Sequence, residues 1–225
     1  MNEPEKPKKG WGWLQWGFIM VVSLIGVGVV IPTFHGTAVQ ARQTSASNNC
    51  RQIIMALRLY AEEHKGAFPD EVVPGITTAN GAFRELIREQ IIEDERIFGA
   101  IASPFIADGN IGQHQSYLEA VSAGENHWMM IAKLRSSDPG HYPFLMENAR
   151  SNMWPPTWLS DQREKPLRGR AWLRGSIIIG RIDNSVNIVR LDKREGSLHL
   201  PESFLKPVGK PPLPDFQILD IEEKK

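Results

Sequence analysis

The side chains best suited to chemistry in this chain of 225 residues are its six histidines and its single cysteine. The histidines are His35, His64, His114, His127, His141 and His199. No two of them have the i, i+4 spacing of a helical zinc site, and Cys50 has no second cysteine for a metal site or an intrachain disulfide. We therefore predict no metal centre and no catalytic group among them.

The serines and carboxylates show no clearer catalytic or metal-binding motif than the histidines do. The chain has no Gly-x-Ser-x-Gly motif, which marks the nucleophile of α/β-hydrolases. Four late acidic residues could supply oxygen ligands to calcium: Asp161, Asp183, Asp192 and Glu195. Their spacing is not that of an EF-hand loop, so we interpret them as solvated turn residues and expect no cofactor, with calcium as the alternative. An enzyme site assembled from His127, Asp138 and His141 is an alternative of another class.

A long uncharged stretch must position everything that follows it. Residues 10–41 contain no Lys, Arg, Asp or Glu. At roughly 1.5 Å per residue, the segment 11–34 is long enough to cross a bilayer core of about 30 Å. Lysines lie within residues 6–9, and the next basic residue is Arg42, which predicts a single-pass anchor with its N-terminus in the cytoplasm. A cleaved signal peptide ending near residues 39–41 is the alternative.

The anchor carries a recognisable pattern. A basic leader ends at Gly10, the aromatic Trp11 follows, and Ile31-Pro32-Thr33-Phe34 comes about two-thirds of the way along the apolar run. This resembles the N-terminus of type IV pilin-like proteins, and in particular the major pseudopilins of type II secretion. The resemblance implies prepilin-type processing between Gly10 and Trp11, a helix kink at Pro32 and an assembly role for position 15. Gln15 stands there where the family has Glu.

The predicted helix continues through residues 35–66. Its outer half has an apolar stripe at helical spacing, formed by Cys50, Ile53, Ile54, Leu57 and Tyr60. Lys65-Gly66 is a good stop signal, because Gly favours helix C-termini. The run from Asn49 to Pro69 also resembles the end of the first helix in secretion-type pseudopilins. The stripe needs a cover, and a small sheet is the natural one.

The remainder, residues 67–225, is predicted to be an outer domain with this sheet. Expected elements are a helix over 82–99, strands over 128–132, 142–146, 175–182 and 185–191, and an edge strand over 216–221. Residues 148–169 and 200–214 are expected to be irregular. Asp183-Asn184 is predicted to form a two-residue type I′ hairpin turn, because both residue types tolerate positive φ. The expected class is α+β and pilin-like, with a leader (1–10), an anchor (11–34), a helical continuation (35–66) and the outer domain.

Charge and resemblance together suggest a role. Lys and Arg total 26, as do Asp and Glu, so the balance gives no sign of a nucleic-acid partner. The resemblance implies a structural or adaptor subunit of a type II secretion or pilus-type assembly, in contact with lipid and other pilin-like subunits, and not an enzyme. Because Gln15 replaces the family's Glu, we expect a minor or tip component, or an anchored domain that does not assemble. The outer domain would be periplasmic or extracellular.

Overall fold

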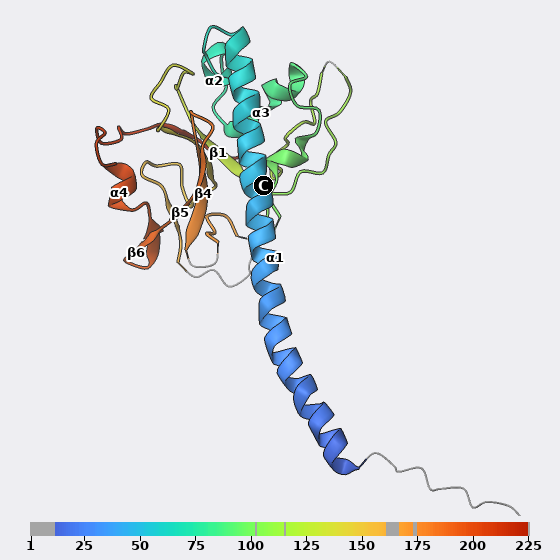
Figure 1. Ribbon diagram of the computed structural model, residues 1–225. Helices are drawn as coiled ribbons and strands as arrows, with labels where there is room; N and C mark the ends of the chain where they lie inside the picture. The colour runs from blue at the N-terminus through green and yellow to red at the C-terminus, as the bar shows by residue number, and fades with distance from the viewer. Residues whose placement is uncertain (1–11, 102, 115, 161–166, 173–174, 225) are drawn as a thin grey trace, which may run out of the picture. The chain divides into compact units, whose positions relative to one another are not determined.

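The computed structural model describes residues 12–101, 103–114, 116–160, 167–172 and 175–224, except for the side chains of residues 14 and 24–37. The chain divides into two units, Met1–Ala41 and Arg42–Lys225. Helix α1 (Trp13–Glu63) is continuous through 51 residues (Figure 1). Within the described part of the chain, no helix meets the length and hydropathy required of a membrane span.

In the first unit, the backbone is helical from Trp13 onward and the large apolar side chains near its start are exposed. Trp13, Trp16 and Phe18 have exposed fractions of 82%, 62% and 71%. The proposed processing site at Gly10 and Trp11 lies outside the described residues. Pro32 lies inside α1 and does not end it.

The second unit contains the outer part of α1 and two antiparallel sheets. The larger sheet has the order β5-β4-β2-β1-β8. Its strands are β1 (Trp128–Ile131), β2 (Pro143–Glu147), β4 (Ser176–Arg181), β5 (Val186–Arg190) and β8 (Ile218–Leu219). All five fall within or next to predicted strands. The mixed α+β class with an antiparallel sheet is therefore confirmed.

The helix covers the sheet with its apolar stripe. Cys50, Ile53, Ile54 and Leu57 are fully buried, and Tyr60 is 1% exposed. The stripe packs on β4, where Cys50 and Ile54 lie against Gly180, and Figure 1 shows this part of α1 beside β4. The helix ends just before the predicted stop, since Lys65 and Gly66 both have positive φ and the Gly66 amide donates to the carbonyl of Ala61 at 2.7 Å.

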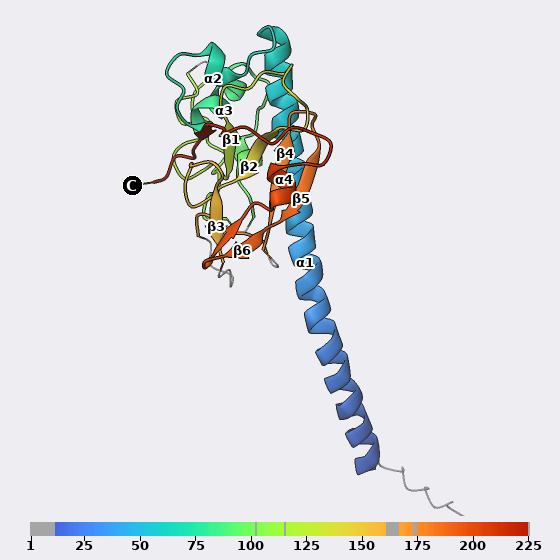
Figure 2. The same cartoon turned by 90° about the vertical axis from the view of Figure 1, so that its left-hand side faces the viewer.

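The smaller sheet was not predicted. It joins β3 (Thr157–Leu159), β7 (Ser197–His199) and β6 (Asp192–Arg194) in the order β3-β7-β6. Figure 2 shows β3 and β6 at the end of this unit that lies away from α2 (Pro69–Val72). The expectation that residues 148–169 are irregular was therefore wrong for β3. Three-residue strands are too short to show an alternating pattern, which is why the sequence did not reveal them.

The predicted helix over 82–99 is two separate elements. Helix α3 (Ala79–Arg88) begins at Thr78, whose side chain accepts from the Gly81 amide, and η1 (Glu95–Phe98) is a short 3₁₀ helix. Gln90, with φ at +57°, separates them because a left-handed residue cannot continue the helix. A further short helix, α4 (Glu202–Leu205), lies in the segment that was expected to be irregular.

The β4–β5 turn has the predicted residues but not the predicted type. Asn184 has φ at +66°, whereas Asp183 is not among the residues with positive φ. The Asn184 amide donates to the carbonyl of Arg181, and the Arg181 amide donates to that of Ser185. The type I′ assignment was therefore wrong: a tight turn from Arg181 is followed by one left-handed residue, as in longer hairpin loops.

Candidate functional site

Three buried polar side chains from separate parts of the chain form one hydrogen-bonded series. Ser103 Oγ lies 2.8 Å from His127 Nδ1, and His127 Nε2 lies 3.0 Å from Glu147 Oε1. The three residues are only 4%, 6% and 2% exposed. Such a series of hydroxyl, imidazole and carboxylate is the pattern of an activated serine nucleophile.

The sheet holds two members of this series in place. His127 directly precedes β1, and Glu147 ends β2 opposite Trp128 in the β1–β2 pair. The Asn148 amide donates to the carbonyl of His127, which closes this end of the pair. Ser103 comes from the loop after η1, where its hydroxyl accepts from the Phe105 amide at 3.1 Å.

Neighbouring contacts determine which nitrogen of the imidazole carries the proton. Asn148 Oδ1 accepts from the Gly169 amide, so Asn148 Nδ2 faces His127 and donates to Nδ1 at 2.9 Å. Nδ1 is therefore an acceptor, and the Nε2–H group donates to Glu147. The Ser103 hydroxyl lies at the same nitrogen, so it shares the single lone pair of Nδ1 with the Asn148 amide.

The Glu147 carboxylate accepts further hydrogen bonds, and Ser103 is almost inaccessible to solvent. Besides His127, Glu147 accepts from Trp172 Nε1 at 2.7 and 2.8 Å and from the Ile178 amide at 2.8 Å. These hydrogen bonds connect β2 to β4 and to the segment that precedes β4. In the conformation described, the series therefore acts as a buried structural network.

The alternative enzyme site of His127, Asp138 and His141 is not assembled. His127 precedes β1 and lies at the Glu147 end of the antiparallel β1–β2 pair, whereas Asp138 and His141 lie in the connection at the opposite end. This particular combination of residues was therefore wrong. Sequence reasoning also missed Ser103 and Glu147. A carboxylate at the end of the apolar strand Pro143–Glu147 could have indicated a buried polar site, because a buried charge needs partners. Nothing in the sequence around Ser103 indicated that it belongs to this site.

The one group of carboxylates able to hold a metal within the described residues was also not predicted. Oxygen atoms of Glu95, Asp108 and Glu125 lie within 4.8 Å of one another. Burial raises the pKa of Glu95 and of Glu125, and the charge of Asp108 adds to both shifts. Three hard oxygen donors suit calcium.

The four acidic residues that the sequence suggested as calcium ligands are not members of this group. Asp161 is outside the described residues, while Asp183, Asp192 and Glu195 belong to no such group in the described part of the chain. Because Glu95 already accepts from the Gly109 and Val121 amides, these carboxylates also have a structural role without a cation.

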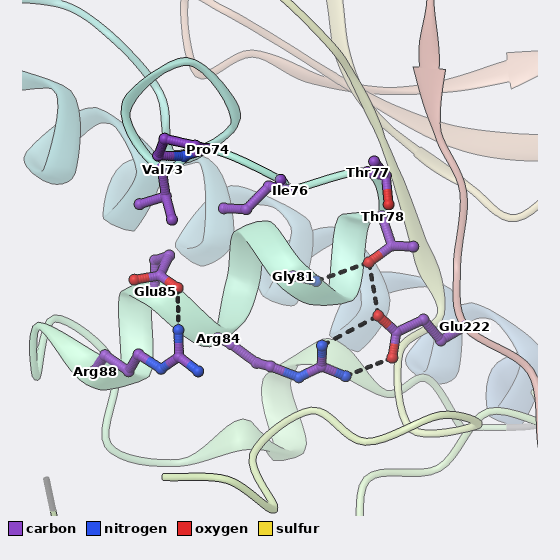
Figure 3. A pocket seen from close by; sticks show the side chains of 11 residues that line it. Val73, Pro74, Ile76, Thr77, Thr78, Gly81, Arg84, Glu85, Arg88 and Glu222 are labelled. Atoms are coloured by element: carbon purple, nitrogen blue, oxygen red, sulfur yellow. Dashed lines mark hydrogen bonds and ion pairs between the residues drawn. The ribbon is translucent and has the colours of Figure 1, made fainter. Parts of the chain in front are cut away.

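A pocket of about 290 Å³ lies between α3 and the loop before it (Figure 3). Its charged side chains are paired within the pocket: Arg84 with Glu222, and Arg88 with Glu85. Thr78 also donates to Glu222 at 2.7 Å. The contacts of Glu222 with Arg84 and Thr78 attach the C-terminal segment to α3.

The residue at the predicted assembly position makes a local contact. Gln15 Oε1 accepts from the Gly12 amide at 3.2 Å, so the side chain caps the start of its own helix. It is otherwise exposed.

Comparisons with known proteins found no match for this chain among family models, curated proteins or solved structures.

Proposed function

We propose that this chain is a membrane-anchored, pilin-like structural or adaptor subunit of a type II secretion or pilus-type assembly, without catalysis of its own. The observation that supports this proposal most is the length of α1 and the packing of its outer part. It is a single helix of 51 residues, and its outer part covers an antiparallel sheet through Cys50, Ile54 and Leu57. A helix of this length, whose outer part packs on a sheet, favours a scaffolding role.

The proposed anchor rests on the sequence of residues 11–34 and on the exposed side chains at their start. Trp13, Trp16 and Phe18 present apolar surface, and no charged residue occurs between Gly10 and Ala41. Lipid or other apolar helices would cover such a surface. The proposed location is the cytoplasmic membrane, with the N-terminus inside and residues 67–225 outside.

The mature N-terminus and the membrane behaviour of the full chain test this function. We expect the chain to resist alkaline extraction, to dissolve in detergent and to begin at Trp11 in a host that has a prepilin peptidase. Gly10→Val should block cleavage. Gly12→Val is the matched control, because a side chain at Gly12 meets nothing within 4 Å.

Other outcomes contradict the proposal in distinct ways. A soluble chain removes the anchor, and a start near Gln43 indicates a cleaved signal peptide. A retained Met1 or Asn2 favours an anchored domain that does not assemble.

A serine hydrolase is the second candidate, favoured by the Ser103–His127–Glu147 contacts. A fluorophosphonate probe separates the two candidates. The structural role predicts no labelling of the native chain, because Ser103 is 4% exposed. Labelling that disappears with both Ser103→Ala and His127→Gln would instead support the hydrolase.

A further inference from the structure

Basic side chains gather at the end of the second unit where α1 enters it. There, Gln43 Nε2 donates to Ser176 Oγ at 3.4 Å, and Ser176 is the first residue of β4. Arg190 of β5 is paired with Ser176. Because residues directly opposite each other in a sheet share a face, Arg190 lies on the side of the sheet that Gln43 contacts.

Two further arginines belong to the same neighbourhood. Arg42 directly precedes Gln43 on α1. Burial lowers the pKa of the Arg170 guanidinium, and the charge of Arg42 acts in the same direction, so the two cations lie near each other. Arg170 also lies over the ring of Trp172, whose amide donates to the carbonyl of Ser176 at 2.7 Å.

The strand β6 adds a fourth cation. Lys193 follows Arg190 by three residues, and Figures 1 and 2 show β6 at the end of the unit where α1 enters. We call these four residues the entry cluster: Arg42, Arg170, Arg190 and Lys193. All but the half-buried Arg170 are exposed.

The charge of the entry cluster is not neutralised locally. None of its members forms an ion pair with any residue that the structure describes. Asp192 lies close to it in sequence but binds Arg194 at 3.1 Å. The exposed Glu195 that follows cannot balance four cations, so this end carries an excess of positive charge.

This excess is offset elsewhere, because the chain has 26 basic and 26 acidic residues. Residues 60–94, which include α2 and α3, contain eight acidic and three basic residues. Figure 2 shows α2 at the opposite end of the unit from β6. A negatively charged surface would therefore attract the entry cluster and repel the other end.

We propose that the entry cluster binds the headgroups of anionic phospholipids in the bilayer that holds the anchor. Arg42 follows Phe34, the last residue of the proposed anchor, by eight residues, which is roughly 12 Å of helix. The headgroup layer covers roughly 5–8 Å of that distance. Long basic side chains extend towards such a layer, and guanidinium groups bind phosphate oxygens through two N–H groups.

The inference rests on the proposed function, since a bilayer lies near Arg42 only if residues 11–34 span it. The lipid selectivity of the full chain in a bilayer tests it. The chain is reconstituted in phosphatidylcholine that contains traces of spin-labelled phosphatidylglycerol or phosphatidylcholine. Electron spin resonance then measures how strongly the protein immobilises each labelled lipid.

Two triple variants are compared with the native chain. The test variant combines Arg42→Gln, Arg190→Gln and Lys193→Gln, and keeps Arg170 because of its contact with Trp172. The matched control removes three exposed cations outside the entry cluster, through Lys65→Gln, Lys133→Gln and Lys210→Gln. The lysines within residues 6–9 are present in every chain and cancel in the comparison.

Each basic side chain near an anionic surface strengthens binding about fivefold. The test variant should therefore lose at least that factor of its preference for phosphatidylglycerol, whereas the control should keep the native preference. Arg42→Lys with Arg190→Lys retains the charges and should also keep it. In about 1 M salt, where the Debye length is about 3 Å, the difference between the native and test chains should disappear.

Equal preferences in the native and test chains, or an equal loss in the control, would overturn the proposal. If the chain is inserted and shows no difference, only the headgroup contact is refuted. A chain that does not insert refutes the anchor instead. Flotation of that chain with phosphatidylglycerol vesicles then decides the contact: binding that the test variant loses supports the entry cluster, and no binding overturns it.

Discussion

Gly180 of β4 lies directly against Ile54 of α1. A Cβ atom at position 180 would stand 2.2 Å from Ile54 Cδ1 and 2.7 Å from Cys50 Sγ. No side chain fits in that space, so this glycine allows the long helix to approach the sheet closely. The contact therefore determines how the apolar stripe of α1 is buried.

Gly180→Ala should destabilise the second unit. Overpacking a filled core costs about 1–3 kcal/mol, because neighbouring side chains must leave their preferred rotamers. We expect the free energy of unfolding in urea to fall by that amount. Ile54→Val in the Gly180→Ala background should recover part of the loss, since it removes the Cδ1 atom nearest to the added methyl group. Strictly additive effects of the two substitutions would contradict this contact.

Asn184→Gly should be neutral or mildly stabilising, whereas Asn184→Val should cost about 1 kcal/mol or more. The reason is the positive φ of +66° at this position, which glycine adopts freely and a β-branched residue resists. Thermal unfolding of the two variants measures the difference. Asn187→Val, at an exposed residue of β5, is the matched control for the same substitution outside the turn. Equal melting temperatures for the Gly and Val variants would exclude the left-handed residue.

Glu222→Gln should lower stability at neutral pH but not in strong acid. Burial raises the pKa of Glu222, but hydrogen bonds from Arg84 and Thr78 and the charge of Arg84 outweigh it and leave the pKa below its ordinary value. A carboxyl group with a lowered pKa stabilises the fold above its unfolded-state pKa. That stability is lost as pH falls through the folded-state value.

The expected loss is about 1 kcal/mol at pH 7, and the two curves of unfolding free energy should converge in acid, where the pH lies below the lowered folded-state pKa of Glu222. Glu62→Gln is a matched control on an exposed face. Parallel curves for Glu222→Gln and the native chain down to that pH would show that the Arg84 pair contributes no pH-dependent stability.

Glu147→Gln should be more damaging than Ser103→Ala. In either orientation the amide nitrogen of Gln would face donors, either Trp172 and Ile178 or His127 and Trp172, and an unsatisfied buried donor costs about 1–3 kcal/mol. Ser103→Ala removes one hydroxyl at the edge of the network and should cost about 1 kcal/mol. Urea denaturation measures both losses. A larger loss for Ser103→Ala would mean that the loop, and not the carboxylate, holds this network together.

Gln15→Glu should increase incorporation into a filament if the mature chain begins at Trp11. A carboxylate can pair with the new terminal amine of a neighbouring subunit, and an unpaired charge in the membrane costs roughly 2.5–3.5 kcal/mol. The native Gln15 instead accepts from Gly12 of its own helix. Immunogold counting of filaments made with the native secretion genes measures the change. Gln15→Asn is the uncharged control, and abundant filaments of the native chain would contradict a minor role.

Local patterns were sufficient for the main elements of the fold. The spacing of Cys50, Ile53 and Leu57 predicted the buried face of the helix, because one side of a helix repeats every 3.6 residues. Consecutive apolar residues at Ile177 and Ile178 predicted a buried strand, and Asp183-Asn184 located its turn. Each of these signals lies within a few neighbouring residues, so the sequence alone determined them.

Contacts between distant segments were decided only by the tertiary structure. Ser103, His127 and Glu147 come from a loop and from the ends of two strands, and nothing in their spacing relates them. Their meeting depends on the register that sets Trp128 opposite Glu147. The need for glycine at position 180 follows in the same way from the distance between α1 and β4. Periodicity determines which face of an element is apolar, whereas register and loop path determine what that face meets.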